Sequence, residues 1–340
     1  MGDGTRIGID ARMISWAVAS VLNTAVQRKG AKLVFPTQNL VDLVWKTKPA
    51  RSKEVINVHS RRFAGQDAES KIAQIRRWIG NHPPARPSYA KITTAPTDSE
   101  RHVATLIANL SNIAWVLNLR GRDVPFTPVF HAYLFIGLDS AILFVDPAKV
   151  DESVRDHLDG LGVEVHEYNE VWQFLRRHSW GKGRVLISDD TSYAISLLLT
   201  HFWYTVDPSP SYVDSLKAIK NPTETEGLRN AYLRDGAAYV KWLAWLEDKL
   251  NSGYEITEWE AANRLTEYRR KNELFEGLAY ENISASGKNA ALPHYKATKG
   301  SAAVINKDTP YLKYVNFSFF FFLFSFSKDE SHSMRLTPFF

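Results

Sequence analysis

The chain has 340 residues, of which 44% are hydrophobic and 23% are charged, the balance of a soluble globular protein with room for about two domains. It contains no cysteine, which excludes disulfide scaffolds, thiolate zinc sites and cysteine nucleophiles and suits a reducing compartment. Its 42 Lys and Arg residues and 37 Asp and Glu residues give a net charge of only +5, too small and too dispersed for a nucleic-acid interface.

Neither end of the sequence indicates a membrane or secreted protein. The first 13 residues, MGDGTRIGIDARM, lack the apolar core of a secretory signal. The strongly apolar run from Phe317 to Phe326 is about half as long as the roughly 20 residues that span a bilayer. We therefore expect a cytoplasmic protein with no membrane partner and no nucleic-acid partner.

The first 80 residues alternate between helical and strand-like patterns. Apolar residues at a spacing of three or four predict a helix over residues 14–26, and Gly30 fits a position after its C-terminus. Residues 31–35 form a strand-like run that Pro36 closes. Only a few residues precede Gly8, so any βα unit at the front is short or absent.

Residues 81–100 have the composition of a linker or long loop, with four prolines and little apolar content. We place a domain boundary there or just before. The following hundred residues alternate again, which predicts a second α/β domain. Its expected elements are a helical run through Leu106 and Leu110, strands at 132–136 and 141–145, a helix at 151–161, a strand at 162–165, a strand at 183–188 and a helix at 192–200.

Two capping patterns predict the helices of the C-terminal part. Asn221-Pro222-Thr223-Glu224 combines a favoured N-cap, a proline at N1 and a glutamate at N3, and apolar residues then recur at helical spacing over about seven turns. Thr257-Glu258-Trp259-Glu260 is a second capping box and opens a shorter helix that extends to Tyr268. These helices indicate the beginning of a further domain.

Few residues outside this framework point to chemistry. The sequence has no HExxH zinc helix, no GxSxG elbow, no Walker A loop and no GxGxxG opening a βα unit. His294 is the exception, because it follows the glycine-containing loop at residues 283–287. A lone histidine beside a tyrosine is more often a packing residue, so on spacing alone a functional role is the less favoured interpretation.

The segment ISASGKNAALPHY, residues 283–295, resembles the IS-x-x-G-x-NAA-x-x-HY segment of the pita-bread metallopeptidases of the Xaa-Pro aminopeptidase P group. The resemblance extends over about residues 4–312. The further blocks that match this group in order are NLVDLVW (39–45) with Pro49-Ala50-Arg51, Phe63-Ala64-Gly65, IAWVLNLRG (113–121), DVPFTPVFHAY (123–133), LFVDP (143–147) and residues 216–238.

The resemblance implies an α/β fold in which two creatinase-type α/β domains precede an incomplete pita-bread (α+β) catalytic domain. Both ends of the chain are expected to be truncated relative to the family. The expected parts are the C-terminal portion of the first creatinase-type domain at 1–80, the second creatinase-type domain with its proline-rich linker at 81–210, the start of the pita-bread domain at 211–312 and an aberrant Phe-rich tail at 313–340.

The resemblance also implies an activity, a metalloexopeptidase that removes the N-terminal residue from peptides with proline in second position. In the family, two Mn²⁺ ions per subunit activate a hydroxide, and two Asp, one His and two Glu hold them, all beyond the residue that matches His294. The family tends to dimerise. His294 is expected to contact the substrate near the scissile carbonyl and to help stabilise the tetrahedral intermediate.

The sequence departs from the family after Leu312. Tyr314 occupies the position of the first metal-binding Asp, and a phenol cannot replace a bridging carboxylate in a site for hard cations. The remaining ligand types nearby do not reproduce the family spacing; they are Asp308, Asp329, Glu330 and His332. We therefore expect this chain to bind no Mn²⁺ pair and to lack activity. The alternative interpretation is a catalytically dead form that acts as a binding or dimerisation module.

Overall fold

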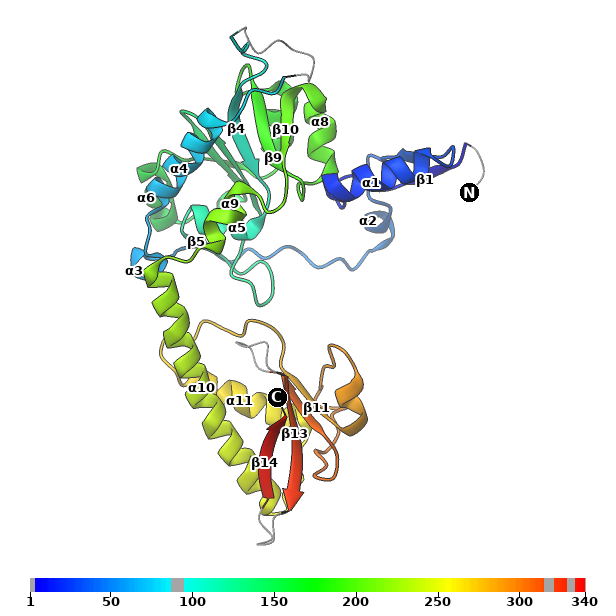
Figure 1. Cartoon of the computed structure of the whole chain (residues 1–340), viewed down its shortest axis with the longest axis vertical. Helices are drawn as coiled ribbons and strands as arrows, with labels where there is room; N and C mark the ends of the chain where they lie inside the picture. The colour runs from blue at the N-terminus through cyan, green and yellow to red at the C-terminus, as the bar shows by residue number, and fades with distance from the viewer. Residues whose placement is uncertain (1–3, 87–94, 315–320, 329–333, 340) are drawn as a thin grey trace. The chain divides into compact units, whose positions relative to one another are not determined.

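The computed structural model describes residues 4–86, 95–314, 321–328 and 334–339 (Figure 1). The chain forms two compact units, the first comprising Met1–Val124 and Pro128–Thr223 and the second consisting mainly of Glu224–Phe340. None of the described helices combines the length and the apolar character that crossing a membrane requires.

A mixed six-stranded sheet forms the centre of the first unit. Its strand order is β10-β9-β4-β6-β7-β8. The first three strands run parallel, β6 is antiparallel to both of its neighbours, and β7 and β8 are parallel again. The strands are β4 (His102–Ile107), β6 (Ala132–Gly137), β7 (Ala141–Val145), β8 (Glu164–Glu167), β9 (Arg184–Ser188) and β10 (Tyr204–Asp207).

Helices cover both faces of this sheet, as Figure 1 shows for α4 and α8. Along β6, Leu134 and Ile136 face one core while Phe135 faces the other, the alternation of a strand buried on both sides. The first core includes residues of α4 (Ala68–Asn81), α5 (Leu110–Val116), α6 (Glu152–Gly160) and α9 (Tyr212–Ala218). The second includes residues of α7 (Glu170–Arg177) and α8 (Tyr193–Trp203).

The predicted helical run through Leu106 and Leu110 is wrong. Residues 102–107 form strand β4, and helix α5 begins only at Leu110, after Asn109 has capped it. The Oδ1 atom of Asn109 accepts hydrogen bonds from the backbone N–H groups of Ser111 and Asn112, at 3.0 and 3.2 Å. A strand buried on both faces is apolar at nearly every position, so two leucines four residues apart do not distinguish it from a helix.

The other predicted elements of this unit are confirmed within a few residues. The strands at 132–136, 141–145 and 183–188 correspond to β6, β7 and β9, and the helix at 151–161 corresponds to α6. The strand at 162–165 begins two residues later than expected, as β8. Helix α8 extends to Trp203 and is interrupted at Thr200, whose φ is +54°.

The N-terminal segment is a short βαβ unit. Strand β1 (Arg6–Gly8) pairs in parallel with β2 (Lys32–Val34), and α1 (Trp16–Gln27) connects them. The Oγ atom of Ser15 caps α1 by accepting from the N–H of Val18 at 3.3 Å. Gly30 follows with a φ of +66°, as the predicted helix end requires. The remaining short elements of the first unit are α2 (Leu40–Val44), β3 (Asn57–Val58), α3 (Arg61–Ala64), β5 (Leu119–Arg120) and the 3₁₀ turn η1 (Pro147–Lys149).

Backbone hydrogen bonds join this segment to the start of α8. The N–H groups of Trp16 and Ala17 donate to the carbonyls of Thr191 and Asp189, at 2.8 and 3.0 Å. In return, the N–H groups of Tyr193 and Ala194 donate to the carbonyls of Ile14 and Ala11, at 2.8 and 2.9 Å. Each helix start therefore satisfies its otherwise unpaired N–H groups on the other segment.

The second unit packs two helices against an antiparallel sheet. Helices α10 (Pro222–Asn251) and α11 (Glu258–Arg270) supply Trp242, Leu246 and Leu265 to a core that Tyr311 completes. The sheet order is β11-β12-β13-β14. Its strands are β11 (Ile283–Ser286), β12 (Tyr311–Tyr314), β13 (Phe321–Lys328) and β14 (Met334–Phe339), and the 3₁₀ turn η2 (Gly287–Ala291) follows β11.

Both predicted helix starts of the second part of the chain are confirmed. Helix α10 begins at Pro222, and α11 begins after Thr257, whose Oγ1 accepts from the N–H of Glu260 at 3.1 Å. The carboxylate of Glu260 accepts a hydrogen bond from the hydroxyl of Tyr254 at 3.2 Å.

The division of the chain into four parts at residues 80, 210 and 312 stays a prediction. Helix α4, which ends at Asn81 and so crosses the first of these boundaries, supplies Ile72, Ile75 and Ile79 to the core of the sheet that follows it. In the Phe-rich segment, the backbone of β13 pairs with both β12 and β14.

Lowering the pH is expected to destabilise the first unit through His102. This side chain is buried, and burial together with the neighbouring His82 and Arg184 lowers its pKa to about 4 from the usual 6.5. Between these two values the unfolded chain binds more protons than the folded chain, so stability falls as the pH falls from 6.5 towards 4. Urea unfolding midpoints measured by circular dichroism at several pH values test this dependence.

The matched variant is His102→Gln, whose amide can still reach the hydroxyl of Thr205, 2.8 Å from Nε2 of the histidine. Because glutamine does not titrate, the variant should show a shallower loss of stability over this pH range. Equal slopes for the two proteins would contradict the assignment.

Candidate functional site

His294, the residue that the sequence singled out for chemistry, lies in the loop after η2. Its side chain is exposed. Its backbone has a φ of +57°, in the left-handed region that non-glycine residues rarely adopt. Such a conformation persists only where the surrounding structure imposes it. The contacts of the neighbouring residues therefore decide how the backbone of His294 is held.

A buried carboxylate holds the segment that carries His294. Glu258, the first residue of α11, is completely buried. Its Oε1 atom accepts from the N–H of Ser286 at 2.6 Å and from the amide of Asn289 at 3.0 Å. Its Oε2 atom accepts from the hydroxyl of Tyr295 at 2.7 Å and from the N–H of Ala303 at 3.0 Å. These charge-assisted bonds and the N-terminus of α11 stabilise the negative charge away from water.

Tyr295 remains a hydrogen-bond donor in this arrangement. Burial and the hydrogen bond to Glu258 raise the pKa of its phenol to about 12. The phenol is therefore protonated at neutral pH. The amide of Asn289 also lies 3.1 Å from its oxygen, so Asn289, Tyr295 and Glu258 contact one another in a closed group.

A second group of polar side chains holds Asn282, the residue before β11. Arg269 binds Asp235 through two hydrogen bonds, Nε to Oδ1 at 2.6 Å and Nη2 to Oδ2 at 3.0 Å. The Nη1 atom of Arg269 also donates to Oδ1 of Asn282 at 3.3 Å, and the Asn282 amide donates to Thr266 at 2.7 Å. Both ends of the Ile283–Ser286 strand are thus anchored to helix α11.

Lys313 on β12 is a charged residue buried in the core of the second unit, beside Asn282. Its ammonium lies 3.3 Å from Oδ1 of Asn282 and 5.9 Å from the ring centre of Trp242, and the side chain is fully buried. Burial is the main reason that the pKa of Lys313 falls to about 7; the positive charge of Arg269 lowers it further and Asp235 opposes the shift. The group therefore loses its proton near neutral pH.

The described residues do not fit a pair of divalent cations. Within residues 4–86, 95–314, 321–328 and 334–339, no three His, Asp or Glu side chains converge in a manner that could hold a metal ion. Tyr314, expected at the position of the first metal-binding Asp, pairs through its backbone with Ile283 of β11. Asp308 follows Asn306 in an exposed turn. Asp329, Glu330 and His332 lie outside the described residues.

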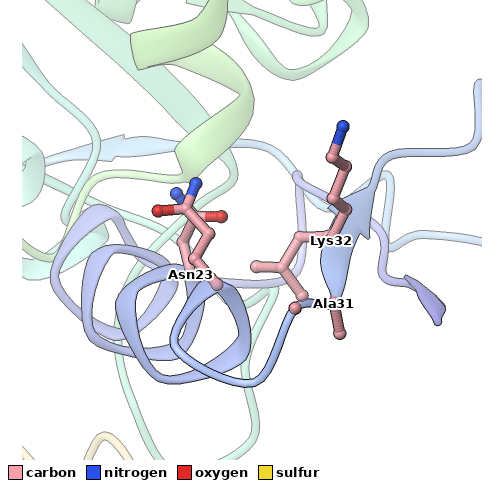
Figure 2. A pocket seen from close by; sticks show the side chains of 6 residues that line it. Asn23, Ala31 and Lys32 are labelled. Carbon is pink, nitrogen blue, oxygen red and sulfur yellow. The ribbon is translucent and has the colours of Figure 1, made fainter. Parts of the chain in front are cut away.

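A hollow on the first unit lies between α1 and β2. Figure 2 shows Asn23 on one side of it and Ala31 and Lys32 on the other. The remaining lining residues are Gln27, Gly30 and Leu33. With a single charged side chain and no nucleophile paired with a base, this lining offers none of the combinations that acid-base or covalent catalysis needs.

The sequence missed Glu258, although it lies inside the capping box used to predict α11. The sequence shows a carboxylate at the first helical position. A carboxylate there has an ordinary explanation, a favourable charge beside the helix dipole, and so does not indicate a buried role. Only the structure shows that this carboxylate faces inward, towards residues 28 to 45 positions later in the chain. Asn289 and Tyr295 were within the segment that resembles the pita-bread family, without a separate role.

Two family models together match most of the chain. The creatinase/prolidase N-terminal domain matches residues 47–224, and metallopeptidase family M24 matches residues 226–317. The chain belongs to the creatinase/prolidase and M24 metallopeptidase family. The expected fold class, creatinase-type α/β domains followed by part of a pita-bread domain, is confirmed by these matches and by the structural neighbour described below.

Curated members of this family from fungi share about a third of their residues with the chain. A probable Xaa-Pro aminopeptidase P of Laccaria bicolor is 35% identical over 318 residues, 92% of this chain and 46% of the relative. A probable Xaa-Pro aminopeptidase P of Penicillium rubens is 36% identical over 318 residues, 91% of this chain and 49% of the relative. The chain therefore spans about half the length of the curated family members it matches.

The fold is also that of solved family members. The X-prolyl aminopeptidase of Caenorhabditis elegans, described as a cytosolic enzyme with a di-nuclear active site, matches 99% of this chain and 52% of its own length with a TM-score of 0.82 and 27% identity. The Xaa-Pro dipeptidase of Bacillus anthracis matches 73% of this chain and 60% of its own with a TM-score of 0.52; at 19% identity this likeness concerns the fold alone.

Replacing Lys313 with methionine is expected to stabilise the second unit at pH 7. The lysine has a pKa of about 7 when folded and 10.5 when unfolded, so wild-type stability rises as the pH increases between these values. Methionine has a similar volume and no charge to bury, so Lys313→Met should raise the urea midpoint at pH 7 and flatten this rise. A midpoint that is lower at pH 7, or an unchanged slope, would show that the lysine is not held as described.

Proposed function

We propose that this chain has the substrate recognition of an Xaa-Pro aminopeptidase, the class of enzyme that removes the N-terminal residue from peptides with proline in second position. Support comes from the family membership and from curated relatives named Xaa-Pro aminopeptidase P, each of which extends well beyond the matched region. The observation that carries the proposal is the segment at residues 283–295, in which a loop fixed on Glu258 presents the exposed His294.

In this proposal His294 contacts the substrate. An imidazole can donate a hydrogen bond to the carbonyl oxygen of the bond to be cleaved and stabilise the charge that develops there. His294 is suited to this role because it is exposed in a loop whose neighbouring residues are anchored inside the protein. The left-handed backbone sets the direction in which its side chain leaves the loop.

We further propose that a polypeptide of this sequence binds such peptides without hydrolysing them. Hydrolysis in the family relies on divalent cations, manganese in the form expected from the resemblance, and the described residues do not fit a pair of such ions. The cytoplasm is the proposed location, in keeping with the cytosolic C. elegans neighbour and with the absence of cysteine from the sequence.

The alternative function is a binding or dimerisation module. Helix α2 favours it, because four of its apolar side chains are exposed, with relative exposures of 59 to 75%. These residues are Leu40, Val41, Leu43 and Val44. Contiguous apolar surface of this kind is typical of a site where another protein docks, and a second copy of the chain is the partner that the family resemblance suggests.

Peptide binding and hydrolysis can be measured on the same sample. We expect a fluorescent peptide with proline in second position to bind, and a peptide with alanine there to bind more weakly. Addition of excess Mn²⁺ should release no N-terminal residue, as followed by chromatography. His294→Ala should weaken binding about fivefold to tenfold, the value of a typical hydrogen bond to substrate.

His201→Ala, which removes an exposed histidine of the first unit, serves as the control and should bind like the wild type. Mn²⁺-dependent release that a chelator abolishes would contradict the proposed lack of hydrolysis. Equal affinity of wild type and His294→Ala would contradict the role of His294. A chain that binds neither peptide but forms dimers in sedimentation velocity would favour the alternative function.

A further inference from the structure

The carboxylate of Glu258 connects every part of the segment around His294. Its hydrogen-bond donors come from the end of β11 (Ser286), from η2 (Asn289), from the residue after His294 (Tyr295) and from the later loop (Ala303). We infer that Glu258 is the positioning residue of the loop 286–295 and hence of His294. The consequence for peptide binding rests on the proposed function; the positioning itself does not.

The site requires a carboxylate rather than any polar group of the same size. The N–H of Ser286 faces Oε1 at 2.6 Å, and the N–H of Ala303 faces Oε2 at 3.0 Å. A glutamine at this position has one oxygen and one NH₂ group. Whichever way the amide is turned, its NH₂ group faces one of these two backbone donors, which is then left unsatisfied in a buried place. Both oxygens of Glu258 are therefore needed.

Glu258 binds residues on both sides of His294 in the sequence. Asn289 precedes the histidine by five residues and Tyr295 follows it directly, and the same carboxylate binds both. Between them, Leu292 donates to the carbonyl of Asn289 at 3.1 Å, and Tyr295 donates to that of Leu292 at 3.3 Å. The loop is thus closed at its base, which imposes the left-handed backbone of His294.

The imidazole itself is left available. The side chain is exposed, and no other residue in the described part of the chain forms a hydrogen bond with it. The neighbours of this histidine are fixed inside the protein, while its ring has no hydrogen-bond partner among the described residues. A ligand therefore meets a hydrogen-bond donor of defined direction. Preorganisation of this kind lowers the cost of ordering the loop when a ligand binds.

Hydrogen exchange of the full chain tests the positioning without any ligand. In Glu258→Gln the backbone amides of residues 287–292, 294 and 295 should exchange at least about tenfold faster than in the wild type, because a buried donor loses its partner. The control is Trp242→Phe, which removes the hydrogen bond from Nε1 to the carbonyl of Ala261 in the same unit and leaves the hydrogen bonds of Glu258 to the loop in place. It should lower the unfolding midpoint and leave exchange at 287–295 within about twofold of the wild type.

Tyr295→Phe provides a milder second variant in case Glu258→Gln does not fold. It removes the donor at 2.7 Å from Oε2 and should also accelerate exchange in the loop. Unchanged exchange in the folded variants would overturn the inference, as would equal acceleration in Trp242→Phe, since the effect would then reflect general destabilisation.

A double-mutant cycle on peptide affinity separates the inference from the proposed function. If Glu258 acts through His294, Glu258→Gln should weaken peptide binding as much as His294→Ala does, and the double variant should be no weaker than either alone. Additive losses would overturn the action through His294. If His294→Ala leaves affinity unchanged while Glu258→Gln accelerates exchange, the proposed substrate contact fails and the positioning role of Glu258 stands.

Discussion

A carboxylate removed from water must receive hydrogen bonds from the protein, and in the second unit this requirement organises a whole segment. Glu258 is completely buried, and neutral donors surround it: two backbone N–H groups, an amide and a phenol. The start of helix α11 adds favourable electrostatics because the helix dipole places partial positive charge there. The turn after β11, the loop of His294 and the strand-like segment at Ala303 consequently share one anchor.

Other buried charged side chains obtain their hydrogen bonds and ion pairs in different ways. In the first unit Lys149 pairs with the buried Asp123, which also accepts from the backbone and ring of His131. Arg269 engages Asp235 with the two parallel hydrogen bonds that a guanidinium is shaped to make. Lys313 has an amide oxygen and an indole face as neighbours, and burial together with the positive charge of Arg269 disfavours its charged form. The partners of a buried charge thus matter as well as its removal from water.

The sequence predicts the ends of helices where a capping residue or a turn defines them. Helix α10 begins at its proline and α11 after its threonine, because both rules concern neighbouring residues. The sequence pattern does not distinguish strand β4 from a helix, because a sheet covered on both faces removes the alternation that identifies a strand. The buried role of Glu258 could not be predicted for a related reason: its partners lie 28 to 45 residues away, and no local pattern records them. The functional role of His294 rests on the resemblance of its segment to the pita-bread family, and its left-handed backbone has no signature in the sequence.

The paired starts of α1 and α8 have a consequence for how the first unit opens. Each helix start donates two backbone N–H groups to the other segment, so opening one removes the acceptors on which the other depends. Breaking the pair exposes four donors together, and neither segment regains them alone. The N-terminal βαβ unit and the beginning of α8 therefore form one cooperative structure, in which residues nearly 180 positions apart become accessible to solvent exchange or to a protease in the same event.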